Sequence, residues 1–431
     1  MNPLLEVVAR HRAGEPVGIY SVCSANPLVI QAALVHARAA DRPALIEATS
    51  NQVNQYGGYT GMRPKQFRDA VLKIADEVAM PHERIVLGGD HLGPHCWRME
   101  LATEALAQAE QMISEYCRTG FRKIHLDCSM PCRDDPRPLP DEIIAERTAA
   151  LCAGAEAAAR SSGGELPLYV IGSEVPAPGG AQTDLHDLEV TRPEAASRTL
   201  DAHRIAFARR GLEAAWQRVI GLVVQPGVEF DDSRVIDYSP GNARGLRACL
   251  APYLRLVFEA HSTDYQTTTA LRALVRDHFA ILKVGPALTF ALREAVWALD
   301  HIEREWLGPE KASQVRDTIL AAMRRDPTYW ATHYRDTGRD LGLKLEYSLS
   351  DRIRYYWPVA EVRSAMSRLA GSFERATPPL ALLHQYLPGA YAAVRAGEVS
   401  AGAQDLLMYQ VRQVLTEYAS ACDQRHNPGG C

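Results

Sequence analysis

The stretch RIVLGGDHLGP, residues 84–94, joins an apolar run to an acid and a histidine. The run 84–87 predicts a buried strand, and the glycines after it let backbone and ligand approach closely. Asp90 could take up a proton at this strand end while His91 binds a divalent cation. Taken alone, the pair is also compatible with a turn in which the aspartate caps a helix and the histidine is exposed. Its meaning therefore depends on what the rest of the chain places beside it.

Seven more apolar, β-rich runs resemble this one. The eight predicted strands are 17–22, 44–48, 84–89, 122–127, 167–172, 219–224, 254–260 and 279–284. The segments between them are long enough for a helix, and 27–40, 65–79 and 103–119 repeat apolar residues at steps of three and four. Eight strand and helix alternations predict an α/β fold, a TIM-type (β/α)8 barrel. A doubly wound open sheet is the alternative.

After about residue 290 the pattern changes to long helical segments interrupted by prolines. We therefore expect a barrel over 1–290 and a helical C-terminal extension over 291–431, packed on the barrel. The extension contains SLSDRIRYYWP, residues 348–358. Arg352 or Arg354 could bind phosphate through the planar guanidinium group, or the segment could be aromatic packing with solvated arginines.

Polar residues gather at the carboxyl ends of the predicted strands. They are Ser21, Glu47, Asp90, His91, Asp127, Glu174, Gln225, His261 and Lys283. Those ends converge on one mouth in a barrel, where active sites of such barrels are built. Loops are polar in general, but this set mixes acids, imidazoles and a lysine beside glycines. We expect the active site there.

Composition excludes several classes of protein. The 431 residues are 47% hydrophobic and 23% charged, and the net charge of −5 gives no basic footprint for nucleic acid. The nine cysteines lack paired CxxC clusters and are typical of reduced thiols. No run approaches the ~20 apolar residues of a membrane span, and no signal-peptide core is visible. We expect a soluble, cytoplasmic protein that forms a homo-oligomer and acts on a small molecule.

Several longer motifs resemble a known family. They are IEATSNQVNQYGGYTGM (46–62), GGDHLGPHCW (88–97), KIHLDCSM (123–130), VVQPGVEFD (223–231), EAHSTDYQT (259–267) and HFAILKVGPALTFALREA (278–295). They are similar to the GatZ and KbaZ proteins, known as accessory subunits of tagatose-1,6-bisphosphate aldolase. The similarity extends through SLSDRIRYYWP and QYLPGA. It implies a TIM-type barrel related to metal-dependent class II aldolases.

The resemblance to class II aldolases implies roles for individual residues. Asp90 matches their acid, and His91 their first metal ligand. Glu174 matches a glutamate near the metal, and His261 the last histidine ligand, just ahead of Ser262 in a phosphate loop. One ligand is missing, because Gln225 and the following PGVE stand where a histidine precedes Gly-Val. An oxygen of Gln225, Glu229 or Glu174 could replace it, and such a site would accept Zn, Ni, Co, Mn or Mg.

The resemblance implies a 4-epimerase that interconverts D-tagatose 6-phosphate and D-fructose 6-phosphate by retro-aldol chemistry. The metal ligands would be His91, Glu174 and His261, with Asp90 as the base. Glu47 and Asp127 would hold sugar hydroxyls or metal-ligand hydrogens. The substrate-binding residues would be Ser21, Gln225, Glu229, Ser262, Lys283, Arg352 and Arg354. Of these, Lys283 and an arginine of the extension would bind the phosphate. His125, which precedes the last residues of its strand, and His95, which follows Pro94, are left out of the ligand set.

Other activities fit the same family. The chain could be a non-catalytic subunit that stabilises a separate class II aldolase catalytic subunit, with an idle metal site. It could be an aldolase on the bisphosphate, which would release dihydroxyacetone phosphate. A tagatose 6-phosphate kinase is a further alternative, but the chain has no GxxxxGK[ST] loop.

Overall fold

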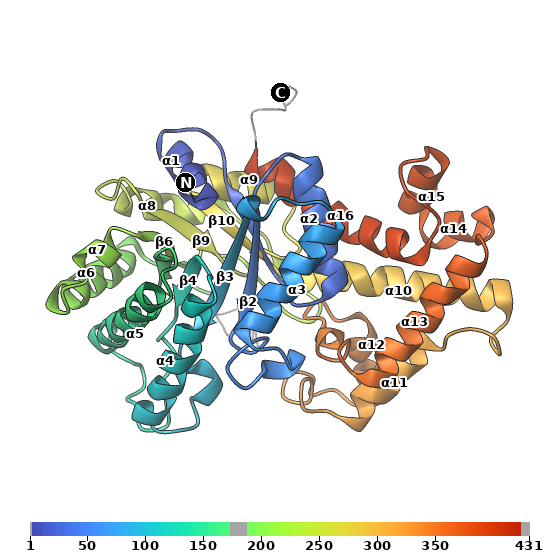
Figure 1. Ribbon diagram of the computed structural model, residues 1–431, viewed down its shortest axis with the longest axis horizontal. Helices are drawn as coiled ribbons and strands as arrows, with labels where there is room; N and C mark the ends of the chain where they lie inside the picture. Colours follow the sequence, from blue (N-terminus) through green and yellow to red (C-terminus); the bar gives the residue numbers. More distant parts are fainter. Residues whose placement is uncertain (1, 173–187, 424–431) are drawn as a thin grey trace.

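The computed structural model describes residues 2–172 and 188–423 (Figure 1). Within them, parallel strands close into an eight-stranded barrel in which β10 pairs back to β1. In barrel order the strands are β1 (Ile19–Cys23), β2 (Ala44–Thr49), β3 (Ile85–Leu92), β4 (Lys123–Leu126), β5 (Leu168–Ile171), β6 (Val219–Val223), β9 (Val257–Ala260) and β10 (Phe279–Val284). The predicted TIM-type barrel is confirmed, and every predicted run overlaps one of its strands.

The barrel strands read as apolar runs because a parallel barrel buries both faces of each strand. The interior near the amino ends of the strands is filled by side chains such as Leu45, Val86 and Ile281. Helix α1 (Pro3–Arg12) adds Leu4 and Val8 to the same cluster. This end of the barrel is therefore a packed core, and polar groups are left to the opposite end.

Helices surround the barrel and cover its outer face. They are α2 (Pro27–Ala39), α3 (Pro64–Glu77), α4 (Ala102–Arg118), α5 (Asp141–Ser161), α6 (Pro193–Arg209), the short α7 (Glu213–Trp216), α8 (Pro240–Cys249) and α9 (Thr268–Arg276). The three helices predicted from periodicity correspond to α2, α3 and α4. Their apolar stripes face the sheet, and their ends differ from the prediction by one or two residues.

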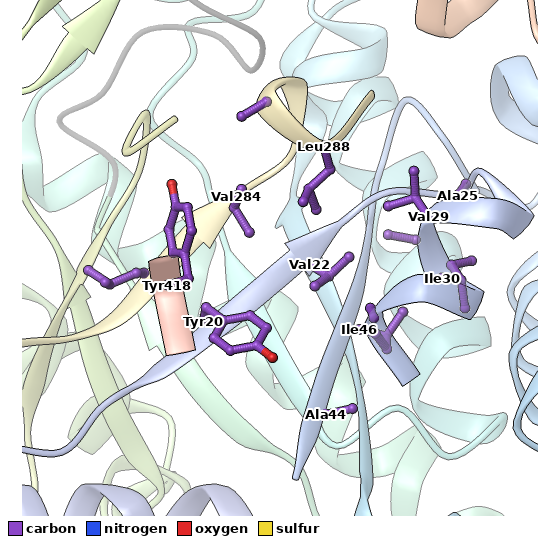
Figure 2. Close-up of a cluster of buried hydrophobic side chains, with 14 of the residues drawn as sticks. Tyr20, Val22, Ala25, Val29, Ile30, Ala44, Ile46, Val284, Leu288 and Tyr418 are labelled. Carbon is purple, nitrogen blue, oxygen red and sulfur yellow. The ribbon is translucent and has the colours of Figure 1, made fainter. Parts of the chain in front are cut away.

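The helix that completes the outer layer comes from the far end of the described chain. Helix α16 (Ala403–Cys422) packs against both α2 and α9, the helices on either side of the β10–β1 seam. Its Tyr418 lies in the apolar cluster with Tyr20, Val22 and Val284 (Figure 2). The amide of Gly18 donates to the carbonyl of Cys422, which ties the helix end to the start of β1.

The segments between β10 and α16 form a helical arm on one side of the barrel (Figure 1). Its helices are α10 (Pro286–Leu307), α11 (Val315–Arg325), α12 (Gly338–Tyr347), α13 (Ala360–Arg375), α14 (Leu380–Tyr386) and α15 (Pro388–Arg395). The boundary expected after residue 290 falls inside α10, which starts directly after β10. A single helix therefore connects the barrel mouth to the arm.

Short 3-10 turns and one small ladder complete the described structure. The turns are η1 (Gly58–Thr60), η2 (His82–Arg84), η3 (Pro94–Trp97) and η5 (Arg352–Tyr355), and the antiparallel ladder pairs β7 (Glu229–Phe230) with β8 (Val235–Ile236). The ladder is not predicted from the sequence because each strand has only two residues. No helix in the described ranges has the length and apolar character needed to cross a membrane.

Candidate active site

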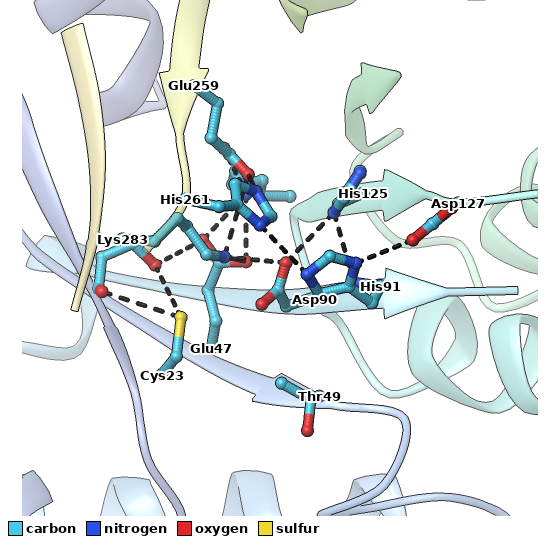
Figure 3. A network of polar contacts seen from close by, with 12 residues as sticks. Cys23, Glu47, Thr49, Asp90, His91, His125, Asp127, Glu259, His261 and Lys283 are labelled. Carbon is cyan, nitrogen blue, oxygen red and sulfur yellow. Dashed lines mark hydrogen bonds and ion pairs between the residues drawn. The ribbon is translucent and has the colours of Figure 1, made fainter. Parts of the chain in front are cut away.

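Four buried side chains converge at the carboxyl end of the barrel (Figure 3). Asp90 and His91 lie near the end of β3, His125 lies on β4, and His261 follows β9 directly. One ligand atom from each lies within 4.8 Å of the others. The strand ends thus bring an acid and three imidazoles together from three parts of the chain.

The backbone of β3 explains how two consecutive residues reach the same cluster. Neighbours on a regular strand point to opposite faces. The pairing of β3 with β4 shifts register between Gly89 and Leu92, and His91 has a φ of 47°. Such irregularities re-aim side chains next to functional sites. The distortion lets Asp90 and His91 both face the mouth.

Two glycines of this stretch make room for the site. A Cβ at Gly88 would lie 2.7 Å from Cγ of Glu47, and one at Gly93 would lie 1.7 Å from the carbonyl oxygen of Asp127. Only a residue without a side chain allows both approaches. The glycines in GGDHLGP therefore place Glu47 and the β4 loop against the end of β3.

Each imidazole is oriented by a partner on its outer side. His91 Nδ1 lies 2.7 Å from Asp127 Oδ2, and His261 Nε2 lies 3.0 Å from Glu259 Oε1. His125 Nε2 lies 3.0 Å from the carbonyl oxygen of Gly172. Metal-ligating histidines are held in this way, with the outer N–H donated to a carboxylate or carbonyl.

The inner nitrogens consequently face each other. His91 Nε2 lies 3.0 Å from His261 Nδ1, and His125 Nδ1, which also accepts the backbone N–H of His91 at 3.2 Å, lies 3.1 Å from Asp90 Oδ1. Lone pairs at this distance repel unless a cation or a proton lies between them. Nitrogen ligands that each bind Zn²⁺ at about 2.0–2.1 Å are themselves about 3.3 Å apart. The donor set therefore fits a divalent metal ion.

Charges around the imidazoles favour a cation. Burial alone would lower the pKa of His91, but Asp90 and Asp127 more than offset it and raise that pKa. Burial lowers the pKa of His261 to about 3, which keeps this imidazole neutral. A neutral ring is the form that binds a metal.

A buried network of three carboxylates and two lysines lies next to the cluster (Figure 3). Lys283 Nζ lies 2.9 Å from both Asp90 Oδ1 and Glu47 Oε2, and Lys123 Nζ lies 2.8 Å from both Glu47 Oε1 and Glu259 Oε2. All five side chains are buried. Burial alone would raise the pKa of Asp90, but Lys283 and the nearby histidines hold it well below its ordinary range. Asp90 is therefore a carboxylate.

A cavity of about 600 Å³ opens above the cluster. Asp90, His91, His261 and Lys283 contribute its barrel wall, whereas Arg354, Tyr355 and Arg363 contribute a wall from the helical arm. The buried ion pair of Arg293 on α10 with Asp351, at 3.2 Å, holds the segment that carries Arg354. Cavities of this size bind small molecules.

Six of the residues predicted from the sequence line this cavity. They are Asp90, His91, His261, Ser262, Lys283 and Arg354. Glu174 lies outside the described residues. The remaining six, Ser21, Glu47, Asp127, Gln225, Glu229 and Arg352, do not line the cavity as described.

The six residues away from the cavity wall are engaged by the protein itself. Ser21 donates to Glu47 at 2.5 Å within the charge network, and Asp127 lies behind His91. Gln225 Oε1 accepts the amides of Gly227 and Val228 and so shapes its own turn. The remaining two contacts are Glu229 with the Ser262 hydroxyl and Arg352 with the Tyr355 phenol. In the structure these side chains therefore contact other protein groups, and their predicted roles toward a substrate stay predictions.

His125 is the residue that the sequence-based ligand set lacks. Lys123, His125 and Asp127 alternate in KIHLD, so they share one face of β4. Lys123 enters the charge network and Asp127 binds His91, which places His125 inward between them. This alternation is the signal that could have identified it. His95, on η3, is not part of the four-residue cluster.

The start of α10 is already occupied by an acid. A helix N-terminus after the last barrel strands is a common phosphate site. Here Asp264 Oδ1 accepts the amides of Gly285 at 3.0 Å and Ala287 at 2.8 Å. Burial raises the pKa of Asp264 to about 6. A phosphate at this position would meet a carboxyl group.

Comparisons with known proteins agree with this architecture. Residues 4–423 match the family model of D-tagatose-1,6-bisphosphate aldolase subunit GatZ/KbaZ-like proteins. A crystal structure of a protein from Sinorhizobium meliloti 1021, described as a probable tagatose 6-phosphate kinase, is 48% identical with a TM-score of 0.87, covering 94% of this chain and 100% of that one.

Two aldolases are more distant. The YdjI aldolase from Escherichia coli K12 is 9% identical, covering 86% of this chain and 95% of its own, and fructose-bisphosphate aldolase from Campylobacter jejuni is 12% identical, covering 86% and 91%. Both have a TM-score of 0.40. The match over nearly the full described length and the 48% identity to the Sinorhizobium protein decide the family. The chain belongs to the GatZ/KbaZ-like family of D-tagatose-1,6-bisphosphate aldolase subunits.

Proposed function

We propose that this chain is a metal-dependent 4-epimerase that interconverts D-tagatose 6-phosphate and D-fructose 6-phosphate. One observation carries the proposal. The three imidazoles and Asp90 converge on one point, with the outer side of every imidazole already oriented, and Asp90, His91 and His261 line a cavity of about 600 Å³. His91, His125 and His261 would hold the ion, and Zn, Ni, Co, Mn or Mg are the candidates.

Asp90 would act as the base. Its carboxylate removes the C4 hydroxyl proton, the C3–C4 bond breaks, and the electron pair passes to the C2 carbonyl. The products of this step are an enediolate and glyceraldehyde 3-phosphate. If the aldehyde turns before the bond re-forms, C4 is inverted. A bound divalent ion would supply electrophilic stabilisation of the negative charge that develops at the carbonyl oxygen.

Lys283 would not bind the phosphate in this scheme. It contacts Asp90 and Glu47, and these partners raise its pKa well above the ordinary value against the opposing effect of burial. It remains an ammonium that keeps Asp90 ionised. Arg363 on α13 and Arg354 face the cavity from the arm and would bind the phosphate instead.

The walls of the cavity favour epimerisation over release of fragments. The helical arm supplies a wall in addition to the barrel mouth, so an aldehyde formed at C4 would be held next to the enediolate. Retained fragments recombine faster than they diffuse away, because holding two reactants together replaces an encounter in solution.

A non-catalytic role as an aldolase subunit is the second candidate, because the family description names a subunit. The two candidates differ in what the isolated chain does. NMR of D-tagatose 6-phosphate with the purified chain, treated with EDTA and then given back metal, separates them. We expect fructose 6-phosphate only with metal, and none with Asp90→Asn.

Asp41→Asn is the matched control, since Asp41 is an exposed acid paired with Arg84. It should behave like the unmodified chain. Metal-loaded, folded protein that leaves the sugar unchanged would contradict the epimerase and favour the subunit role. Formation of dihydroxyacetone phosphate from the bisphosphate, or of ADP from ATP, would instead identify an aldolase or a kinase.

A further inference from the structure

Inversion at C4 requires a second proton donor and acceptor in addition to Asp90. When the aldehyde turns, the C4 oxygen leaves its first position and the new alkoxide forms on another side of the sugar. A proton donor is needed there, and the same group must accept the proton when the reaction runs in reverse. The candidates are the titratable groups on the arm side of the cavity.

Tyr355 meets this requirement by its position. It lies at the end of η5 and lines the cavity from the arm. Its phenol oxygen accepts hydrogen bonds from Arg354 Nη2 at 3.2 Å and from Arg352 Nη1 at 3.4 Å. Both contacts use the oxygen as an acceptor, so its own O–H remains available to donate.

The Tyr355 ring is held in place on two sides. Tyr329 stacks on it with ring centroids 4.7 Å apart and an interplanar angle of 2°, and Tyr59 meets it at 4.6 Å. The Arg354 guanidinium lies 4.8 Å from the ring centroid. A side chain fixed in this way presents its hydroxyl in one direction, as a catalytic group requires.

Other titratable groups that line the cavity are less suitable. One oxygen of the Asp264 carboxyl, Oδ1, accepts the amides of Gly285 and Ala287, which holds this group at the start of α10. Burial raises the pKa of Tyr59 and, well above its usual range, that of Cys23, so both hold their protons tightly. Tyr355 is the aromatic hydroxyl whose oxygen is supported by two guanidinium groups.

We propose that Tyr355 is the second acid–base residue of this site and exchanges a proton with the C4 oxygen from the arm side of the cavity. The inference rests on the proposed epimerase function. In one direction Asp90 takes the C4 hydroxyl proton and the C3–C4 bond breaks. After the aldehyde turns, the bond re-forms and the new C4 alkoxide takes the proton of Tyr355. Asp90 is left protonated and Tyr355 is a phenolate, and exchange with water restores both.

The surroundings of Tyr355 suit both halves of this cycle. Burial alone would raise the pKa of its phenol, but Arg354 and Arg352 more than offset that effect and lower it. The titratable or charged groups around it are Arg352 and Arg354 on η5, Tyr59 on η1, and Tyr329 from the segment after α11. The two cations therefore favour the phenolate that the reverse reaction needs as a base.

The test uses Tyr355→Phe in the full chain, since phenylalanine keeps both ring contacts. We expect epimerisation of tagatose 6-phosphate to fall by about 100-fold or more, the usual contribution of general acid–base catalysis. A second assay supplies dihydroxyacetone and glyceraldehyde 3-phosphate and determines the C4 configuration of the ketose 6-phosphate formed. The unmodified chain should make both epimers, and Tyr355→Phe only the epimer whose oxygen is protonated by Asp90.

A merely structural role would reduce both epimers equally. Tyr386→Phe on α14, a tyrosine that is not part of the described cavity wall, is the control and should match the unmodified chain. Fluorotyrosine at position 355, which lowers the phenol pKa, should move the alkaline limb of the rate profile to lower pH. Retained epimerisation within about threefold, or an unchanged ratio of epimers in Tyr355→Phe, would overturn the proposal. Failure of the unmodified chain to epimerise would instead overturn the proposed function.

Discussion

The ammonium of Lys283 lies 2.9 Å from Oδ1 of Asp90, inside a barrel end where both side chains are buried. This contact keeps Asp90 ionised. The same ammonium group also offsets part of the negative charge of Glu47 and Glu259. The proposed catalysis and the stability of the fold would therefore depend on the same ion pairs. Removing a buried lysine of this kind should destabilise the fold far more than removing a lysine on the surface.

Replacing Lys283 should destabilise the fold strongly. Lys283→Met leaves Asp90 and Glu47 buried with less compensating charge, and such a loss costs about 3–5 kcal/mol. Urea unfolding should show this change in the free energy of unfolding. Lys65→Met, which removes an exposed pair with Asp69, should stay within about 0.5 kcal/mol. Equal changes in the free energy of unfolding for the two variants would mean that the buried network does not stabilise the fold.

Removing His125 should weaken metal binding. His125→Gln takes away a nitrogen that lies 3.1 Å from Asp90 Oδ1 and in the same cluster as His91 and His261. Even outer partners of metal ligands contribute 10–100-fold to metal affinity, so we expect a loss of at least about tenfold. Titration of metal-free protein, followed by metal analysis, measures it. His82→Gln, at an exposed histidine, should bind metal as before; an unchanged affinity in His125→Gln would remove His125 from the ligand set.

The ends of β3 and β9 explain why part of this site could be predicted from the sequence. Asp90, His91 and His261 directly follow apolar runs that only a buried strand suits, so their place at the mouth follows from the barrel. His125 could not be placed as easily, because it lies inside β4 and its direction depends on strand alternation. The alternation in KIHLD indicates that His125 shares a face with Lys123 and Asp127, but only the pairing of β4 with its neighbours shows that this face is the inner one.

The cavity wall formed by the arm could not be predicted. SLSDRIRYYWP is a candidate phosphate segment from its composition alone, but which arginine reaches the cavity depends on contacts between distant residues. The buried pair of Arg293 with Asp351 orients η5 so that Arg354 lines the cavity, whereas Arg352 does not. Such long-range packing has no periodic signal in the sequence. The same holds for α16, which completes the outer layer from more than a hundred residues away.

Glu229 should make stability fall as the pH rises. Burial raises its pKa to about 7, whereas the ordinary value is 4.5. Between these two pH values the carboxyl group is protonated in the native state and ionised in the unfolded state. Its stabilising contribution is therefore complete below about pH 4.5 and is lost as the pH rises through about 7. The full difference is about 3 kcal/mol, at 1.36 kcal/mol per pKa unit.

Glu229→Gln removes this titration. Urea unfolding of both proteins between pH 4.5 and 8 should show the variant gaining stability relative to the unmodified chain as the pH rises. Glu83→Gln, at an exposed glutamate, should give a difference that does not change with pH. A flat difference for Glu229→Gln would mean that this carboxyl group titrates normally in the folded protein.

Arg363 should determine the preference for a phosphorylated sugar. It is exposed on α13 and lines the cavity, and Lys283 and Asp264 are both engaged elsewhere. Hydrogen bonds to charged groups contribute about 1.5–3 kcal/mol, so Arg363→Met should reduce kcat/KM for tagatose 6-phosphate by about 10–100-fold, mainly through KM. The same variant should change kcat/KM for unphosphorylated tagatose by less than about threefold, because that sugar lacks the group that the guanidinium binds. Arg395→Met on α15, at an exposed arginine, is the matched control and should leave both values unchanged. An equal loss of kcat/KM with both sugars would mean that Arg363 supports the folding of the arm. Arg354 would then be the residue that binds the phosphate.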